Sequence, residues 1–351
     1  MRHLTLDQLL FELDRRSGLI PTAFDIGRRK LVWIDLEAYH LYEGFFHRAL
    51  DSFAALKQSR PTPASVAEFV TDSDVLSDRR VVTDSIYPTG LIFHPGRCGS
   101  TLLARILARD RRHLVIGEAA AHNQVWLALT NNGEVTLTTS EENQQVYKHL
   151  VLAMGRKRLL GHEAHFIKFT SFNILFFDFI RSVFPDVPAI FLYREPVDIL
   201  ASYAKKPPGW FNSNQEPLRR LLAKATLDVG EAQDAFGSAA NAVVAFFTAG
   251  LRAAENGARY LNYTKLNPDN LPVIMNALNV SLTVNQLTTM QSQFKFDSKV
   301  DHRATRFAGS RVQDTLAIEE RSRDRLRRLY DQLVRSDFNV APPGFGGTAG
   351  V

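Results

Sequence analysis

An α/β fold, with a central and largely parallel β-sheet flanked by helices, is predicted for the chain from about residue 89 onward. Two observations predict it. Short apolar runs alternate with helical stretches, and strands that alternate with helices form βαβ units whose strands lie parallel. Glycine and charged residues directly follow several of these runs, and open parallel sheets bind their ligands beyond the carboxyl ends of the strands. We therefore expect the functional residues at that edge of the sheet.

Three regions are expected along the chain. Residues 1–88 form an accessory N-terminal region, residues 89–340 the α/β domain, and residues 341–351 a flexible tail. In the first region, residues 1–16 read as an amphipathic helix and residues 30–36 as a strand. A further helix is indicated by apolar residues at helical spacing, for which simple core packing is the expected role: Leu41, Phe45, Phe46, Ala49, Leu50 and Phe53.

The elements of the second region follow from apolar runs, capping residues and turn residues. The expected strands are 90–93, 113–117, 165–170, 189–193 and 259–263. The expected helices are 100–108, 119–129, 140–154, a segment ending near 183, 197–205 and 239–255, with a last amphipathic helix around 326–333.

Composition restricts the class of protein. Hydrophobic residues make up 45% and charged residues 23%, which is ordinary for a globular protein with a core. No stretch approaches the roughly 20 apolar residues of a membrane span, and the N-terminus does not read as a signal peptide. We therefore expect no membrane association and a cytoplasmic location. The net charge of +5 is spread over separate basic pairs, so no nucleic-acid partner is expected.

No metal site or intrachain disulfide is expected either. Cys98 is the single cysteine, so neither a disulfide within the chain nor a cysteine-rich metal site can form. The segment 162–165 (HEAH) lacks the i, i+4 histidine spacing of a helical zinc motif, and it is interpreted as a loop.

The segment from His94 to Thr101 (HPGRCGST) is the candidate anion site. It joins an apolar strand to a helix, and a glycine-containing turn at a helix N-terminus points free backbone N–H groups at one spot. Arg97 adds a fixed positive charge, and Ser100 and Thr101 add hydroxyl donors. Helix capping explains one of those hydroxyls but not the whole pattern. The backbone of Gly96, Cys98 and Gly99 completes the predicted phosphate loop.

This loop departs from the nucleotide loop of kinases. A Walker A motif requires a lysine directly after its final glycine, and here Ser100 follows Gly99. The magnesium-binding acid expected at another strand end is replaced by Arg194. A magnesium-dependent kinase is therefore disfavoured.

A second anion motif follows the strand 189–193. Arg194 stands at the carboxyl end of the strand, where its guanidinium can bind a phosphate through two hydrogen bonds. Pro196 suits the first helical turn, and Ser202 lies two turns further along. The alternative interpretation is an ion pair of Arg194 with Glu195 or Asp198, and a surface hydroxyl for Ser202.

Together the two motifs resemble those of PAPS-dependent sulfotransferases. In that family a basic residue, here Arg97, precedes the turn that binds the 5′-phosphosulfate. About a hundred residues later, the family has a strand followed by Arg-x-Pro and then a Ser, and this motif binds the 3′-phosphate. Here Arg194 and Ser202 stand at the positions of that Arg and that Ser. Lys206 falls where the tyrosylprotein branch places a further basic ligand. The resemblance covers residues 89 to roughly 300. It is a resemblance to bacterial-type members of the family that carry tyrosylprotein-sulfotransferase-like motifs. It implies a P-loop NTPase-like fold with a parallel five-stranded sheet.

The same resemblance implies catalytic roles for three residues. Arg97 and Lys168 would neutralise charge on the sulfuryl group and the leaving nucleotide, PAP. Glu118, in a Gly-Glu pair after the second strand, matches the catalytic base of the tyrosylprotein branch, and we expect burial to raise its pKa. His122, and more weakly His94, are the alternative bases, because the soluble branch uses a histidine. The alternative for Glu118 is a helix N-terminal acid, and for Lys168 a side chain that snorkels to water.

Four further expectations concern the surroundings of the nucleotide. Tyr263 resembles a cofactor-contacting position, although Thr264 replaces the usual acid, and Lys299 would close over the nucleotide. The Cys98 thiol, at a helix N-terminus beside Arg97, should have a lowered pKa and react readily. The acceptor pocket would be lined by aromatic residues after the second motif, which otherwise simply pack: Tyr203, Trp210 and Phe211.

Three hypotheses about function follow. The first is a sulfotransferase that moves a sulfuryl group from PAPS to a hydroxyl of a small-molecule or peptide acceptor, without a metal. The second is a P-loop kinase or another nucleotide-dependent transferase. The third is a catalytically inactive protein that binds PAP or another nucleotide. The sequence does not reveal the acceptor or the oligomeric state.

Overall fold

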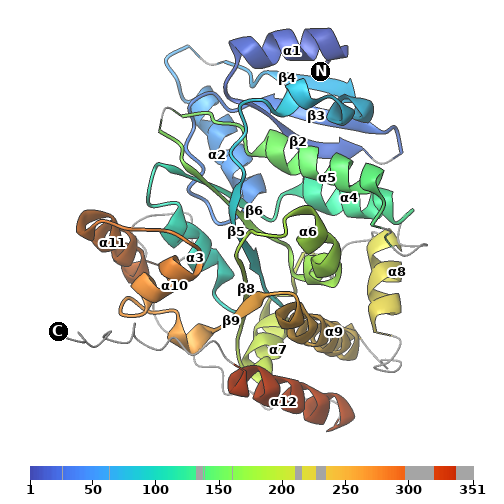
Figure 1. Ribbon diagram of the computed structural model, residues 1–351, viewed down its shortest axis with the longest axis vertical. Helices are drawn as coiled ribbons and strands as arrows, with labels where there is room; N and C mark the ends of the chain where they lie inside the picture. The colour runs from blue at the N-terminus through green and yellow to red at the C-terminus, as the bar shows by residue number, and fades with distance from the viewer. Residues whose placement is uncertain are drawn as a thin grey trace, which may run out of the picture.

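The computed structural model describes residues 1–25, 27–62, 64–131, 137, 139–159, 161–209, 216–226, 235–296 and 320–336. Two sheets organise it (Figure 1). A four-stranded N-terminal sheet has the order β1-β4-β3-β2, and a five-stranded sheet has the order β6-β7-β5-β8-β9. Every neighbouring pair of the second sheet is parallel, so the predicted α/β fold with a central parallel sheet is confirmed. Lys299 and the aromatic residues Trp210 and Phe211 lie outside the described residues, as does the predicted tail.

The parallel sheet agrees closely with the predicted strands. Its members are β5 (Pro88–Phe93), β6 (His113–Gly117), β7 (Ala164–Lys168), β8 (Ala189–Tyr193) and β9 (Ala258–Asn262). Their side chains alternate between two hydrophobic clusters, as they must when both faces of a sheet are covered. Leu91 and Phe93 point to one cluster, and Ile92 between them points to the other.

Helices cover both faces of this sheet (Figure 1). The face of Ile92 packs against α3 (Ser100–Leu107), α10 (Leu271–Ala277) and α11 (Val284–Gln291). The opposite face packs against α4 (Ala120–Leu129), α5 (Glu141–Met154), α6 (Phe177–Val183), α7 (Pro196–Lys205) and α9 (Ala235–Glu255). Helices α8 (Glu216–Ala225) and α12 (Glu320–Arg335) pack on α9.

The N-terminal sheet was only partly expected. Its strands are β1 (Arg2–His3), β2 (Leu19–Asp25), β3 (Lys30–Asp35) and β4 (Glu68–Asp72), of which only β3 was predicted. Helix α1 (Leu6–Arg15) packs there as expected, with a capping box between Thr5 and Gln8. The predicted helix over residues 41–53 begins later, as α2 (Phe46–Gln58), and the segment before it crosses the end of the parallel sheet.

One hydrophobic cluster joins the N-terminal region to the α/β region. It contains Leu31 and Trp33 of the N-terminal sheet as well as Leu91 and Ile167 of the parallel sheet. Short 3₁₀ helices complete the described fold: Ser73–Ser77, Arg79–Val82, Ser171–Phe176, Tyr263–Lys265 and Ser292–Lys295. Among the helices described, none is long and apolar enough to cross a membrane.

Candidate active site

The loop after β5 has the backbone of an anion cradle. Gly96, Arg97 and Gly99 all have positive φ, at +93°, +55° and +90°, and Gly99 is the N-cap of α3. Backbone N–H groups in successive left-handed or turn conformations converge on one point, where the helix dipole also favours negative charge. A non-glycine residue with positive φ, such as Arg97, is strained, and such strain gathers at functional sites.

Helix α7 packs against the loop 94–101 and supports it. The Tyr203 hydroxyl donates a hydrogen bond to the Pro95 carbonyl at 2.5 Å, and a Cβ on Gly96 would lie 2.4 Å from that hydroxyl oxygen. Tyr203 is fully buried. Of the two alternatives for Tyr203, lining an acceptor pocket or simple packing, the structure shows packing, because its ring supports the loop 94–101.

Cys98 points away from the anion cradle. Its side chain is 0% exposed, and its thiol donates to the Leu192 carbonyl at 3.1 Å. Burial raises the pKa of the Cys98 thiol to about 12. The prediction of a lowered pKa and a reactive thiol is wrong, because loss of water outweighs the helix N-terminus and the nearby positive charges. Only the backbone of Cys98 is available to an anion.

Three predicted residues meet at the carboxyl ends of β5, β6 and β7. Lys168 Nζ lies 2.7 Å from Glu118 Oε1, and His94 Nε2 lies 3.5 Å from the same oxygen. Glu118 has a positive φ of +51°, and its amide donates to the Lys168 carbonyl at 2.7 Å. The three side chains come from segments far apart in sequence, and the register of β5, β6 and β7 places them together.

His94 enters this cluster as a neutral donor. The Gly96 amide donates to His94 Nδ1 at 3.0 Å, so the ring proton resides on Nε2, which faces Glu118. Burial lowers the pKa of His94 below its ordinary value. His94 was predicted only as the weakest alternative base, and it is the histidine that reaches the site.

The electrostatics of Glu118 differ from the prediction. Burial alone would raise the pKa of Glu118, but the positive charge of Lys168 and the contact with His94 outweigh it and lower the pKa to about 2. The expectation of a raised pKa for Glu118 is therefore wrong. Lys168 is 0% exposed, so it does not snorkel to water, and burial lowers its pKa despite the neighbouring carboxylate.

His122, the other alternative base, packs in an aromatic cluster. Its ring contacts Tyr147 and Phe169 edge-on, and its Nδ1 lies 3.4 Å from the Tyr147 hydroxyl. Burial lowers the pKa of His122 to about 3. This surrounding is that of a core histidine, whereas Glu118 and His94 meet at the carboxyl ends of the strands.

The second motif lies next to the phosphate loop. Tyr263, at the end of β9, packs so tightly on Gly99 that a Cβ there would lie 2.6 Å from the ring. The guanidinium carbon of Arg194 lies 4.8 Å from the centre of the same ring. Tyr263 thus packs against residues of both motifs.

The cations of both motifs have partners within the protein. Arg194 donates to Asp198 from Nε at 2.9 Å and from Nη2 at 2.7 Å, so the ion pair named as the alternative interpretation of Arg194 is present. Arg97 donates from Nη2 to the Lys206 carbonyl at 2.5 Å, which ties the loop to the end of α7. Ser202 is half-buried on α7, and the Lys206 side chain is exposed.

Comparisons with solved structures show a loose likeness in fold. Neither a family model nor a curated protein matches this chain. A crystal structure of the sulfotransferase STF9 from Mycobacterium avium is similar over 95% of this chain and 97% of that chain, with 14% sequence identity and a TM-score of 0.47. Similarity at this level concerns the arrangement of elements only.

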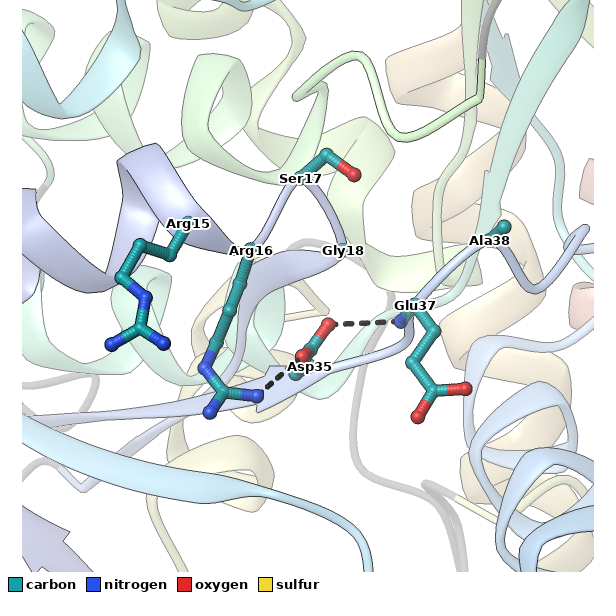
Figure 2. Close-up of a pocket in the computed structure, with 7 residues that line it drawn as sticks. All are labelled: Arg15, Arg16, Ser17, Gly18, Asp35, Glu37 and Ala38. Carbon is teal, nitrogen blue, oxygen red and sulfur yellow. Dashed lines mark hydrogen bonds and ion pairs between the residues drawn. The ribbon is translucent and has the colours of Figure 1, made fainter.

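Two other features lie apart from this site. A pocket of about 420 Å³ in the N-terminal region is lined by charged residues, shown in Figure 2. Its acids already have partners, since Asp35 accepts from Arg16 and from the Glu37 amide, each at 2.9 Å. Among the residues that the structure describes, no group of three or more His, Cys, Asp or Glu side chains is arranged to hold a metal ion.

The residue that sequence reasoning missed is Phe45. It was expected in the core face of a helix, but it precedes α2, and the centre of its ring lies 4.0 Å from Lys168 Nζ. No sequence signal links these residues, because Phe45 precedes α2 and Lys168 ends β7, and the two meet only in three dimensions.

Proposed function

We propose that this protein is a sulfotransferase that moves a sulfuryl group from PAPS to a hydroxyl of a small-molecule or peptide acceptor in the cytoplasm. One observation carries the proposal: a carboxylate–ammonium pair of half-buried Glu118 and fully buried Lys168 lies at the same sheet edge as a glycine-rich anion loop. Such a pair offers a proton acceptor and a positive charge side by side, as transfer of an anionic group to a hydroxyl requires.

The residues present suit a nucleotide with phosphate groups at both ends of its ribose. The loop amides and Arg97 would hold the 5′ group, and Arg194 and Ser202 the 3′-phosphate, with Lys206 and Tyr263 beside them. Two buried nitrogens, Lys168 Nζ and His94 Nε2, have no hydrogen bond of good geometry within the described residues, so an incoming acceptor oxygen would satisfy both. PAPS would supply the sulfuryl group.

In the proposed reaction the acceptor oxygen forms a bond to sulfur while the bond from sulfur to the nucleotide breaks. Glu118 takes the proton of the acceptor hydroxyl, and Lys168 and Arg97 neutralise charge on the transferring group. The low pKa of Glu118 depends on the charge of Lys168. When Lys168 turns toward the anionic group, the pKa of Glu118 rises toward a value suited to a general base.

Thermal unfolding with and without ligand tests the nucleotide. PAP should stabilise the protein, by about 2.7 kcal/mol at 100 times its dissociation constant. Stabilisation by ATP with Mg²⁺ but not by PAP would favour a kinase and refute the proposal.

Arg194→Ala should weaken PAP binding by about 2–5 kcal/mol. Arg80→Ala, which removes a similar but exposed ion pair with Asp78, should leave PAP binding unchanged.

Transfer itself is tested with radiolabelled PAPS and a mixture of hydroxyl acceptors. The wild type should label an acceptor. Glu118→Gln should bind PAP and fail to transfer. Normal turnover by Glu118→Gln would place the base elsewhere, and PAP binding without transfer by the wild type would indicate an inactive nucleotide-binding protein.

A further inference from the structure

The ammonium of Lys168 has two neighbours of different kinds. Glu118 Oε1 lies 2.7 Å from Nζ, and the centre of the Phe45 ring lies 4.0 Å from Nζ. Lys168 is 0% exposed, so water does not complete its surroundings. A cation at this distance from a ring is attracted by the negative charge of the ring face, and the attraction grows where water is absent.

Phe45 reaches Lys168 because two glycines let the chain pass close to the sheet edge. A Cβ on Gly117 would lie 2.5 Å from the Gly44 carbonyl oxygen, and a Cβ on Gly44 would lie 2.4 Å from Thr101 Cγ2. The backbone before Phe45 therefore fits between the end of β6 and the first turn of α3. This approach fixes the place of the ring next to the candidate active site.

Helix stability does not explain a phenylalanine here. Phe45 is the N-cap of α2, and its side chain makes no capping hydrogen bond. Ser, Thr, Asp and Asn are preferred at this position because their oxygen accepts from an amide of the first turn. The residue is thus unfavourable for its own helix, and its half-buried ring packs on a charged group.

We propose that Phe45 is a positioning residue for Lys168, so that the N-terminal region completes the active site. The ring covers the ammonium on a side that Glu118 does not, keeps water away, and holds Nζ at the end of β7. Only the kinetic consequence rests on the proposed sulfotransferase function; the contact itself does not. The other titratable groups around Lys168 are Glu118 after β6, His94 and Cys98 in the loop after β5, and Arg48 of α2, whose guanidinium carbon lies 5.3 Å from the Phe45 ring centre.

Competitive labelling of lysines with acetic anhydride, read by mass spectrometry, tests this without any nucleotide. Exposed Lys148 is the internal reference. Phe45→Leu should raise the labelling of Lys168 roughly threefold to thirtyfold, the range from an exposed to a desolvated cation–π contact. Phe45→Trp, which keeps an aromatic face, should restore protection. Phe11→Leu is the matched control, because it removes an exposed ring that lies 5.2 Å from the guanidinium carbon of Arg15.

Two results would overturn the proposal. One is unchanged labelling of Lys168 in a folded Phe45→Leu variant; the other is an equal rise in the leucine and tryptophan variants. If Phe45→Leu does not fold, Phe45→Met replaces it in the same labelling test.

With PAPS, Phe45→Leu should lower kcat and shift the pH profile of kcat, while the affinity for PAP stays unchanged. If PAP fails to bind the wild type, the sulfotransferase proposal falls and the labelling result still decides the role of Phe45.

Discussion

Lys168 carries its charge in a place that water does not reach. Its partner Glu118 is less enclosed, with 21% of its side chain exposed. This asymmetry matters because an unpaired charge costs most where solvent cannot replace the partner. The two halves of the pair should therefore respond differently to substitution.

We expect Glu118→Gln to destabilise the fold more than Lys168→Met. Losing one partner of a buried pair costs about 3–5 kcal/mol, and the glutamine leaves Lys168 fully buried with an amide in place of a carboxylate. In Lys168→Met the remaining Glu118 can gain hydration. Urea unfolding of the two variants and of the double variant measures this. The double variant should be close to Lys168→Met, and a larger loss in Lys168→Met than in Glu118→Gln would contradict the asymmetry.

Cys98 provides a second prediction at this scale. Because burial raises its pKa to about 12, iodoacetamide at pH 8 should modify the native thiol on the order of a hundredfold more slowly than the thiol of the unfolded chain. Mass spectrometry over time, with and without urea, follows the reaction. Fast modification of the native protein would show that the loop opens far more often than its contacts suggest.

Residue-level prediction from the sequence succeeded where chemistry restricts the choice of side chain. A lysine inside an apolar strand was expected to reach water or an anion, and Lys168 meets the carboxylate of Glu118. It failed where groups distant in the chain decide: burial raises the pKa of Cys98, whereas Lys168 and His94 lower that of Glu118, and both shifts are opposite to expectation. Local sequence shows neighbours along the chain, but burial depends on residues that fold against them.

At the scale of elements, the strands of the parallel sheet were predictable because each is a short apolar run between turn residues. The N-terminal sheet was not. Strand β1 has two residues, and β2 contains Pro21 and an irregular register between Pro21 and Ala23. Proline and a bulge both break the alternation on which strand prediction relies. Helix α2 begins after the predicted position because the segment through Gly44 bends closely past Gly117 before the helix starts.

The loop between β5 and α3 gives a prediction about this element. Gly99→Ala should destabilise the protein and weaken PAP binding, because φ is +90° and the new methyl group would lie 2.6 Å from the Tyr263 ring. Gly161→Ala is the matched control, since Gly161 has a φ of +91° with nothing within 4 Å. Backbone strain alone should cost the control about 1 kcal/mol, and Gly99→Ala should cost clearly more.

Thermal unfolding and PAP titration of both variants measure the difference. Equal losses would mean that Tyr263 moves aside easily and does not define the loop. Tyr263→Ala in the Gly99→Ala background should then recover nothing, whereas the tight contact predicts partial recovery of stability.

At the scale of the whole molecule, several histidines are buried in neutral form. Burial lowers the pKa of His122 and His162 to about 3, and that of His165 to about 4. The unfolded chain binds protons at these residues below a pH of about 6.5, and the native protein does not. Their contribution to stability is therefore present above that pH and is lost as the pH falls toward the folded-state values.

We expect the free energy of unfolding to decrease between pH 6.5 and 4, by up to about 1.4 kcal/mol per pH unit for each such histidine. Urea unfolding at several pH values measures the slope. His122→Phe should reduce this pH slope by the contribution of one histidine. His47→Gln, at an exposed position, should leave the slope unchanged. A stability that is flat across this range would mean that these rings gain protons without opening the core.

The order of the parallel sheet also has a consequence for biosynthesis. Strand β5 is central, and both of its neighbours, β7 and β8, follow it in the chain, while Tyr263 closes the phosphate loop only after β9. During translation the loop therefore leaves the ribosome long before the strands that flank it, and non-local pairing is the slow step of folding. A nascent chain that ends before β8 would expose the apolar edge of β5, so chaperone binding during synthesis should concentrate on that interval.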